Sequence, residues 1–231
     1  YLIKPVNPNQ VLLSIKKNVH SHQLVTEQTT ADYRAEFGHI TSQVGQADSF
    51  ADWCAIYKKL VSWDIELSES TDQGIKEVLA YQKTEANNEF CKFVRRNYQS
   101  WINRRDERTP VMSHTLMRSN IFPVVDENRK TTLLLIDNFR YDQWRSINSM
   151  LHPWFDIAVD DFYCAILPTA TQYARNAIFA GLMPLAIDKL MPRLWLNDNE
   201  DGGKNQYEED FLKRQMQTMG KSYRYSFDKL V

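Results

Sequence analysis

Hydrophobic residues recur every three or four positions through most of residues 9–103, a spacing typical of amphipathic helices. Residues 9–18 show this spacing first, with Val11, Leu12 and Ile15 on one side. The more polar stretch 24–44 repeats it, and we expect that stretch to continue the same helix as a connector. The first part of the chain therefore predicts long helices.

Two further helices follow in the pattern. Asp48 is expected to cap a helix whose apolar side carries Phe50, Trp53, Ile56, Tyr57, Leu60 and Val61. A longer helix is expected to begin at Thr71-Asp72 and to end before Thr109-Pro110, because the residue before proline disfavours helical geometry. Three antiparallel helices fit this length, so we predict a helical bundle.

The pattern changes after Arg129-Lys130. Residues 131–136 read TTLLLI and stop at Asp137, which predicts a strand buried on both faces of a parallel sheet. Each buried Leu or Ile would contribute roughly 1.5–3 kcal/mol. Residues 154–161 and 163–167 are expected to add strand structure, and helices are expected from about Gln172 to Gly181 and over 208–219. Strands that alternate with helices predict an α/β region.

Asp137 is the first candidate for chemistry. If residues 131–136 form a strand, its carboxylate emerges at the carboxyl edge of the sheet, where open α/β sheets bind their ligands. The alternative is structural, since Asp137 could cap the helix that starts near Tyr141. The segment alone does not separate these two interpretations.

Thr171 is the second candidate. The turn Pro168-Thr169-Ala170-Thr171 leads into a predicted helix, so Thr171 lies at or just before a helix N-terminus, where free N–H groups favour an anion. The alternative is that Thr169 or Thr171 only caps this helix.

Together the two segments resemble the alkaline phosphatase superfamily. An apolar strand followed by Asp137-Asn138-Phe139-Arg140 is similar to its first metal-ligand segment, although its phosphodiesterases usually have Gly in place of Asn138. Residues 168–171, followed by Gly181-Leu182-Met183-Pro184, resemble its nucleophile segment, and Arg175-Asn176 is closer to the PglZ branch. The resemblance implies that Asp137 is a metal ligand and that Thr171 is the nucleophile, which also contacts that metal.

This resemblance also implies a cofactor. A threonine hydroxyl is a weak nucleophile unless a base or a metal favours its alkoxide. Carboxylate and imidazole ligands suit zinc, without excluding manganese, and we expect two zinc ions in the full-length protein. The remaining ligands are expected downstream of Val231, since no histidine follows His152. Arg175, one turn after Thr171, is placed either to contact the substrate phosphate or to pair with a structural acid.

The start of the chain resembles the end of a receiver domain. Residues 1–6 read as a strand that runs into Lys4-Pro5, and a helix follows. By this resemblance Lys4 pairs with the phosphoryl group, the Lys4-Pro5 bond is cis, and Tyr1 is the switch aromatic. The alternative is a simple strand–turn–helix linker. An isolated receiver end could not bury its own core, so we expect the chain to be a fragment whose phosphoacceptor lies upstream.

Composition narrows the class of protein. The 231 residues are 43% hydrophobic with a formal charge of −1, which gives no general case for nucleic-acid binding. No stretch approaches the roughly 20 apolar residues of a membrane span, and no signal-peptide pattern is present. Cys54, Cys91 and Cys164 show no metal spacing and are interpreted as reduced core thiols of a cytoplasmic protein.

These observations predict three regions and an α/β fold with an all-α region. Residues 1–19 are the receiver's last strand and helix, residues 20–128 a helical bundle or linker, and residues 129–231 the first part of an alkaline-phosphatase-like α/β domain. This order resembles PorX-type response regulators of type IX secretion. The resemblance implies a homodimer, a zinc-dependent phosphodiesterase acting on oligonucleotides or cyclic oligonucleotides, and two partners, a sigma factor and the cytoplasmic side of the secretion motor.

Two functional hypotheses remain open at this point. In the first, the chain belongs to an enzyme in which Thr171 attacks phosphorus beside a metal held by Asp137. In the second, the same fold is a non-catalytic signalling module that docks protein partners. A full set of metal ligands would favour the enzyme, and wild-type signalling by an Asp137→Ala variant would favour docking.

Overall fold

The computed structural model describes residues 8–103, 107–127, 130–197 and 199–229. It divides into two compact units, the first made of residues 1–108 and 139–159 and the second of residues 109–138 and 160–231. Tyr1, Lys4 and the predicted cis bond after Lys4 lie outside the described residues. None of the described helices is both long enough and apolar enough to cross a bilayer.

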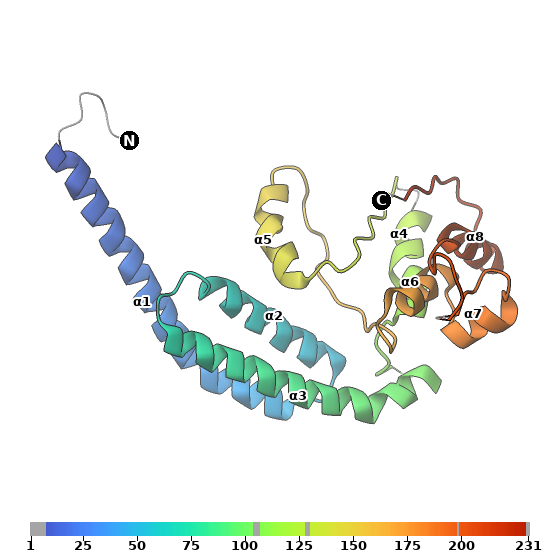
Figure 1. The fold of residues 1–231 in the computed structure, drawn as a ribbon, viewed down its shortest axis with the longest axis horizontal. Helices are drawn as coiled ribbons and strands as arrows, with labels where there is room; N and C mark the ends of the chain where they lie inside the picture. The colour runs from blue at the N-terminus through green and yellow to red at the C-terminus, as the bar shows by residue number, and fades with distance from the viewer. Residues whose placement is uncertain (1–7, 104–106, 128–129, 198, 230–231) are drawn as a thin grey trace. The chain divides into compact units, whose positions relative to one another are not determined.

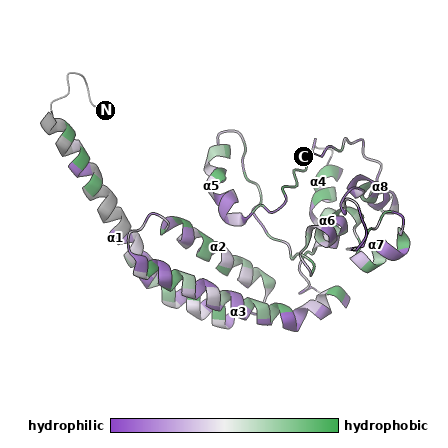
Figure 2. Cartoon of the chain, in the orientation of Figure 1, coloured by the Kyte–Doolittle hydropathy of each residue, from purple (hydrophilic) through white to green (hydrophobic). Residues whose placement is uncertain are grey.

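Three long helices form the first unit (Figure 1). They are α1 (Pro8–Gln46), α2 (Phe50–Glu66) and α3 (Gln73–Asn103), and each packs against the other two. In Figure 2, apolar and polar residues alternate along α2 and α3, as expected for helices with one buried side. The predicted three-helix bundle is confirmed, and α1 runs without a break through both stretches that showed helical spacing.

The helix ends follow local hydrogen bonding. Ser49, rather than the predicted Asp48, caps α2, and it shares a capping box with Asp52. Asp48 is one residue too early, because its side chain is not the one that accepts from the first turn of α2. The predicted start of α3 at Thr71-Asp72 is confirmed, because Asp72 Oδ1 accepts from the backbone N–H of Ile75 at 3.2 Å.

The core of the bundle is largely aromatic. The rings of Phe90 and Phe93 lie 5.4 and 6.0 Å from that of Trp53, and Phe93 also meets Trp101 at 5.6 Å. A polar pair is buried on the α1 side, where the Tyr33 hydroxyl donates to Gln82 Oε1 at 2.9 Å. The aromatic residues are therefore packing residues, and the polar pair ties α1 to α3.

The first unit also contains α5 (Tyr141–Leu151), which packs against α2. The rings of Tyr57 and Tyr141 lie 5.9 Å apart. The strand predicted over residues 154–161 is wrong: the segment has no β structure and exposes Trp154, Phe155 and Val159. Its apolar residues have no neighbouring strand to pair with in the described structure.

The second unit is a cluster of short helices around α6 (Thr171–Ala180). Its members are η1 (Ser113–Thr115), η2 (Met117–Ile121), α4 (Phe122–Asp126), α7 (Pro184–Leu190) and α8 (Glu208–Thr218). α6 packs against η1, α7 and α8, and its Phe179 and Ile178 belong to two hydrophobic clusters. The predicted helices over residues 172–181 and 208–219 are confirmed.

The predicted α/β character of this region is not observed in the described residues. The strand expected over 131–136 is wrong here, because the segment forms no β ladder with another described segment. Leu134 is 79% exposed and Ile136 60%, while Leu135 packs against the core. One parallel bridge, between Met112 and Cys164, is the β pairing that the described residues contain. A strand needs a neighbouring strand for its backbone groups, and the described residues provide no such strand beside residues 131–136.

The cysteine prediction is partly wrong. Cys164 is buried, and burial raises the pKa of its thiol to about 11. Cys54 is half-buried, but Cys91 is exposed on α3 and is no core thiol. Cys91 lies on the side of α3 that faces away from the aromatic core, because its neighbours Phe90 and Phe93 take the inward positions.

Candidate active site

The second unit brings Asp137 and Thr171 into contact. Thr171 is the first residue of α6, and Asp137 ends the extended segment 131–136. The Thr171 hydroxyl Oγ1 donates to Asp137 Oδ2 at 3.3 Å, although the two residues lie 34 positions apart in the chain. Both side chains are exposed, so the pair is open to a ligand. The sequence prediction that these two groups meet at one place agrees with this geometry.

The capping interpretations of these residues are wrong. The N-cap of α5 is Arg140, whose backbone N–H donates to Gln143 Oε1 at 2.9 Å, and Asp137 takes no part. The N-cap of α6 is Ala170, and no side chain caps that helix. Asp137 and Thr171 therefore do not cap these helices.

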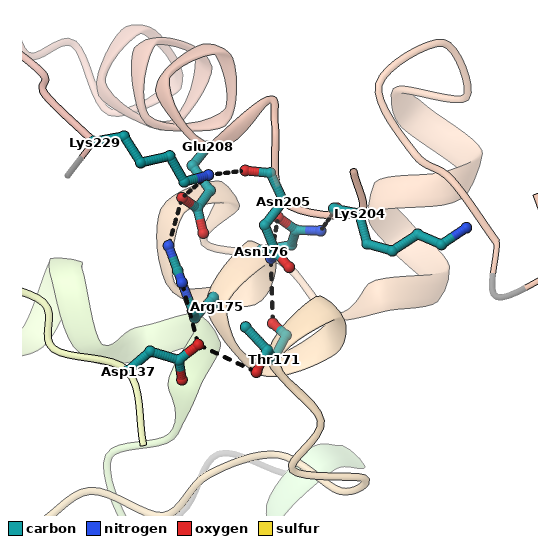
Figure 3. A network of polar contacts seen from close by, with 8 residues as sticks. All are labelled: Asp137, Thr171, Arg175, Asn176, Lys204, Asn205, Glu208 and Lys229. Carbon is teal, nitrogen blue, oxygen red and sulfur yellow. Dashed lines mark hydrogen bonds and ion pairs between the residues drawn. The ribbon is translucent and has the colours of Figure 1, made fainter. Parts of the chain in front are cut away.

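Arg175 lies between two acids in the same network (Figure 3). It follows Thr171 by one helical turn, so both side chains leave the same side of α6. Its Nη2 donates to Glu208 Oε2 at 2.8 Å, and its Nη1 donates to Asp137 Oδ2 at 3.3 Å. Of the two sequence interpretations of Arg175, pairing with an acid is the one that the contacts bear out.

Glu208 is a buried acid that pairs with two cations of this network. Its side chain is 2% exposed and accepts a second cation, Lys229 Nζ, at 3.0 Å. Glu208 Oε1 and Arg175 Nε are buried with no hydrogen-bond partner. A buried carboxylate needs such pairing, because desolvation of an unpaired charge is costly.

Sequence reasoning missed Glu208, although a signal was present. Glu208 precedes Phe211, Leu212 and Gln215 by three, four and seven residues, which places it on the apolar side of α8. An acid on the buried side of a helix predicts a cationic partner. Lys229 and Asn205 were also missed, and no sequence pattern singles them out.

The side-chain amides of Asn205 and Asn176 form hydrogen bonds that hold the start of α6 in place. Asn205 Nδ2 donates to the backbone oxygen of Thr171 at 3.2 Å and to Asn176 Oδ1 at 3.1 Å. Asn176 is 1% exposed, and its Nδ2 donates to the backbone oxygen of Lys204 at 3.0 Å. Lys204 and Asn205, in the loop before α8, therefore help to fix the part of α6 that carries Thr171.

The pKa of Tyr163 is affected by burial and by the negative charge of Asp137. Burial raises the pKa of its phenol, and the negative charge of Asp137 raises the same pKa further. Both effects raise the pH at which the phenol ionises.

Two protein families match the chain. Residues 23–102 match the PorX response regulator linker domain, and residues 116–231 match the BREX system PglZ alkaline phosphatase-like domain. No curated protein matched the chain. Because the second match covers half of the sequence, the chain belongs to the PglZ alkaline phosphatase-like family. The linker match ahead of this domain confirms the predicted PorX-type response regulator, with a phosphatase-like effector.

Alkaline phosphatase-like domains are typically metal-dependent, and the donor set here meets part of that requirement. Asp137 supplies a carboxylate oxygen and Thr171 a hydroxyl oxygen that meet at one point, which suits a divalent cation. The described residues hold no group of three or more His, Cys, Asp or Glu side chains that could complete the shell. The pair thus fits as two ligands of a metal site.

Proposed function

We propose that this chain belongs to a response regulator whose PglZ domain hydrolyses phosphodiesters, with Thr171 as the nucleophile. The contact between Thr171 Oγ1 and Asp137 Oδ2 carries the proposal. It joins a hydroxyl at a helix N-terminus to a carboxylate, which is the pair that phosphoryl transfer through an activated hydroxyl requires. The PglZ match over residues 116–231 supports the same class of chemistry.

Each residue of the site has a defined task in this proposal. Thr171 Oγ attacks phosphorus and displaces one alcohol of the diester, which leaves with the proton of the hydroxyl. The phosphoryl group, still carrying its second ester, stays on Thr171 Oγ until water hydrolyses that bond and releases a phosphate monoester. Asp137 accepts the hydrogen bond of the hydroxyl and orients it. The positive end of the α6 helix dipole favours the negative charge of the phosphoryl group, and Asn205 keeps that helix end in place.

Asp137 and Thr171 would also hold a zinc ion, one of two in the whole protein. When bound, the metal lowers the pKa of the nucleophile and neutralises charge on the phosphoryl oxygens. In the complete PglZ domain, residues 131–136 would pair as a strand of an α/β sheet. The unpaired, exposed Leu134 and Ile136 support this, since an apolar extended segment is suited to a buried strand.

The wider context follows from the PorX-type assignment. We propose that residues 1–19 end a receiver domain in which Lys4 and Tyr1 respond to phosphorylation, and that the whole cytoplasmic protein forms a homodimer. Its substrates would be oligonucleotides or cyclic oligonucleotides. Its partners would be a sigma factor and a cytoplasmic component of the type IX secretion motor. The linker match over residues 23–102 supports this architecture.

Hydrolysis of bis(p-nitrophenyl) phosphate by the whole protein with added zinc tests the proposal. Thr171→Ala removes the attacking oxygen, and we expect kcat to fall by about 10³-fold or more. Thr171→Ser keeps a hydroxyl at the same position and should retain part of the activity. Thr169→Ala, two residues earlier and exposed, is the matched control and should behave as wild type. Wild-type turnover by Thr171→Ala would contradict the assigned role.

A non-catalytic docking role is the second candidate. The Arg175 cation that already contacts Asp137 favours it, because that ion pair satisfies the carboxylate without a metal. Asp137→Asn distinguishes the two functions, because it removes the ligand charge and keeps the shape of the side chain. The enzyme hypothesis predicts loss of both hydrolysis and signalling in this variant, whereas docking predicts that signalling survives.

A further inference from the structure

The exposed side of α3 separates its charges by sign. Its residues recur every three or four positions, so they share one face of the helix. We call this set the outer face of α3, and all of its members are exposed: Glu77, Tyr81, Glu85, Asn88, Lys92, Arg95, Arg96 and Gln99. The two acids come before Asn88, and the three bases come after it. The outer face is therefore negative along its first half and positive along its second half.

Ion pairs within the chain leave most of these bases unmatched. Lys92 pairs with Glu89 at 2.7 Å, but both side chains are exposed to a large extent, and exposed pairs of this kind contribute little. Among the residues that the structure describes, Arg95 and Arg96 take part in no ion pair. Lys92 and Arg96 also lie one turn apart, and like charges at that spacing destabilise a helix. The cluster of bases therefore lacks a counter-charge in the described part of the chain.

The helix dipole does not explain the separation. It stabilises acids near the start of a helix and bases near its end, but the effect falls off within the first and last turns. α3 is one uninterrupted helix from Gln73 to Asn103 (Figure 1), so Glu85 and Lys92 each lie about three turns from the nearer end. A helix face that is only solvated commonly mixes both signs along its length. The pattern therefore points to a partner that carries the reverse order of charges.

We propose that the outer face of α3 binds the outer face of α3 in a second copy of this chain, with the two helices antiparallel. A two-fold axis between residues 88 and 89 brings the negative half of each helix onto the positive half of the other. Glu85 of one copy then lies opposite Lys92 of the other, and Tyr81 lies opposite Arg96. The inference rests on the homodimer proposed above, and it assigns that homodimer a surface in the helical bundle.

Apolar area on the same side of α3 supports this contact. Tyr81 is 64% exposed and Val78 41%, although both lie on a helix that buries its other side. A guanidinium packs well on an aromatic ring, and this attraction grows when water is excluded, so Arg96 suits the exposed ring of Tyr81. The contact from Glu77 to Gln99 is roughly 33 Å long. A single pair of helices buries little area, so we expect weak association that depends on concentration and salt.

Charge reversal in each half of the outer face, followed by sedimentation velocity of the whole protein, tests the inference. The double variant Glu77→Arg with Glu85→Arg makes the face basic throughout, and Arg95→Glu with Arg96→Glu makes it largely acidic. Each variant alone should self-associate with a Kd raised about tenfold or more, because like charges then face each other. An equimolar mixture of the two should associate at least as tightly as wild type, because an acidic face then meets a basic one. Raising the salt from about 50 to about 500 mM should weaken both the wild-type dimer and the mixed one.

Lys16→Glu with Lys17→Glu is the matched control. These two bases are adjacent and exposed like Arg95 and Arg96, but they lie on α1, so the same change of charge should leave self-association as in wild type. Circular dichroism checks that each variant keeps its helices. If a reversed variant does not fold, Arg95→Gln with Arg96→Gln takes its place and should raise the Kd in the same direction.

Three results would overturn the inference: a wild-type protein that stays monomeric, reversed variants that self-associate like wild type, or a mixture that associates no better than its components. These outcomes are separate from the test of the proposed function. If the protein forms dimers that ignore both reversals, the proposed homodimer stands and the α3 surface is wrong. If the mixture associates while Thr171→Ala turns over the diester normally, the surface stands and the nucleophile is wrong.

Discussion

Among single residues, Gly181 fixes the end of α6, the helix that carries Thr171 and Arg175. Its φ is 65°, a left-handed conformation that side chains rarely adopt, and its N–H donates to the Ala177 carbonyl at 3.0 Å. A Cβ atom at this position would overlap the side-chain amide of Gln215 on α8. Gly181 is therefore required by both its backbone and its neighbour.

Gly181→Ala should destabilise the second unit for these two reasons. The left-handed conformation alone costs a residue with a Cβ about 1–2 kcal/mol, and displacement of Gln215 adds to that cost. Urea unfolding followed by circular dichroism should show a lower midpoint with an unchanged m-value.

Gly220→Ala separates the two contributions. Gly220 has a φ of 67°, but a Cβ atom at this position would meet nothing within 4 Å, so only the backbone term applies. We expect Gly181→Ala to lower the midpoint further than Gly220→Ala. Equal shifts would mean that the Gln215 contact is unimportant.

Single residues also show how much of the candidate site could be predicted from the sequence. Asp137 and Thr171 were predicted to meet because their two segments together resemble those of the alkaline phosphatase superfamily, and the hydrogen bond between the two side chains agrees with that resemblance. The ion pair between Arg175 and Glu208 could not be predicted, because it depends on how α6 and α8 pack. The sequence shows that Glu208 is on the apolar side of α8 but not which cation it meets.

Among the elements, the helices were predictable and the strands were not. A helix satisfies its backbone within its own segment, so the three-residue and four-residue spacing along α1, α2 and α3 was sufficient. A strand depends on a neighbouring strand, and the part of the chain that the structure describes provides none for residues 131–136. The same hydrophobic run was therefore identified correctly as extended and incorrectly as buried.

The start of α2 provides a prediction at this scale. The side-chain hydrogen bond from Ser49, followed by the one from the Ser49 backbone, lowers the pKa of Asp52 below its usual value of 3.8. A lowered folded-state pKa stabilises the protein above the unfolded value, and the stability is lost as pH falls through the folded value. Asp52→Asn should thus cost about 0.3–1 kcal/mol at pH 7, the usual size for an exposed acid at a helix N-terminus.

Thermal unfolding across a pH series checks this. The difference between wild type and Asp52→Asn should shrink as pH falls below 3.8, because the Asp52 carboxylate is then protonated and loses the charge that Asn lacks at every pH. Glu66→Gln, at the exposed acid that ends α2, is the control and should show little difference from wild type at pH 7. A difference for Asp52→Asn that is constant with pH would contradict the capping charge.

At the scale of the whole molecule, the two units have separate cores. The first unit buries the aromatic cluster around Trp53 and the polar pair of Tyr33 and Gln82. The second buries two hydrophobic clusters around α6. The chain passes between the units after residues 108, 138 and 159, so the sequence order of elements alone does not define either one. Stability of the bundle and of the candidate site should therefore respond to different substitutions.

Tyr33→Phe tests this separation. Tyr33 is fully buried, and its hydroxyl donates to Gln82 Oε1, while Gln82 Nε2 donates to the Phe37 carbonyl and to Thr41 Oγ1. Loss of the hydroxyl leaves a buried acceptor without its donor, which costs about 1–3 kcal/mol. Tyr81→Phe, at a tyrosine of α3 that is 64% exposed, should stay within about 0.5 kcal/mol of wild type.

The pH dependence of Tyr33→Phe gives a second, independent measurement. Burial raises the pKa of Tyr33 from 10.0 to about 12, so the protonated phenol stabilises the folded state below pH 10. That contribution is lost between pH 10 and 12, and the advantage of wild type over Tyr33→Phe should shrink across this range in urea unfolding. The proposed hydrolysis of bis(p-nitrophenyl) phosphate by the whole protein should not change in this variant. A fall in kcat as large as that expected for Thr171→Ala would show that the bundle and the site are energetically coupled.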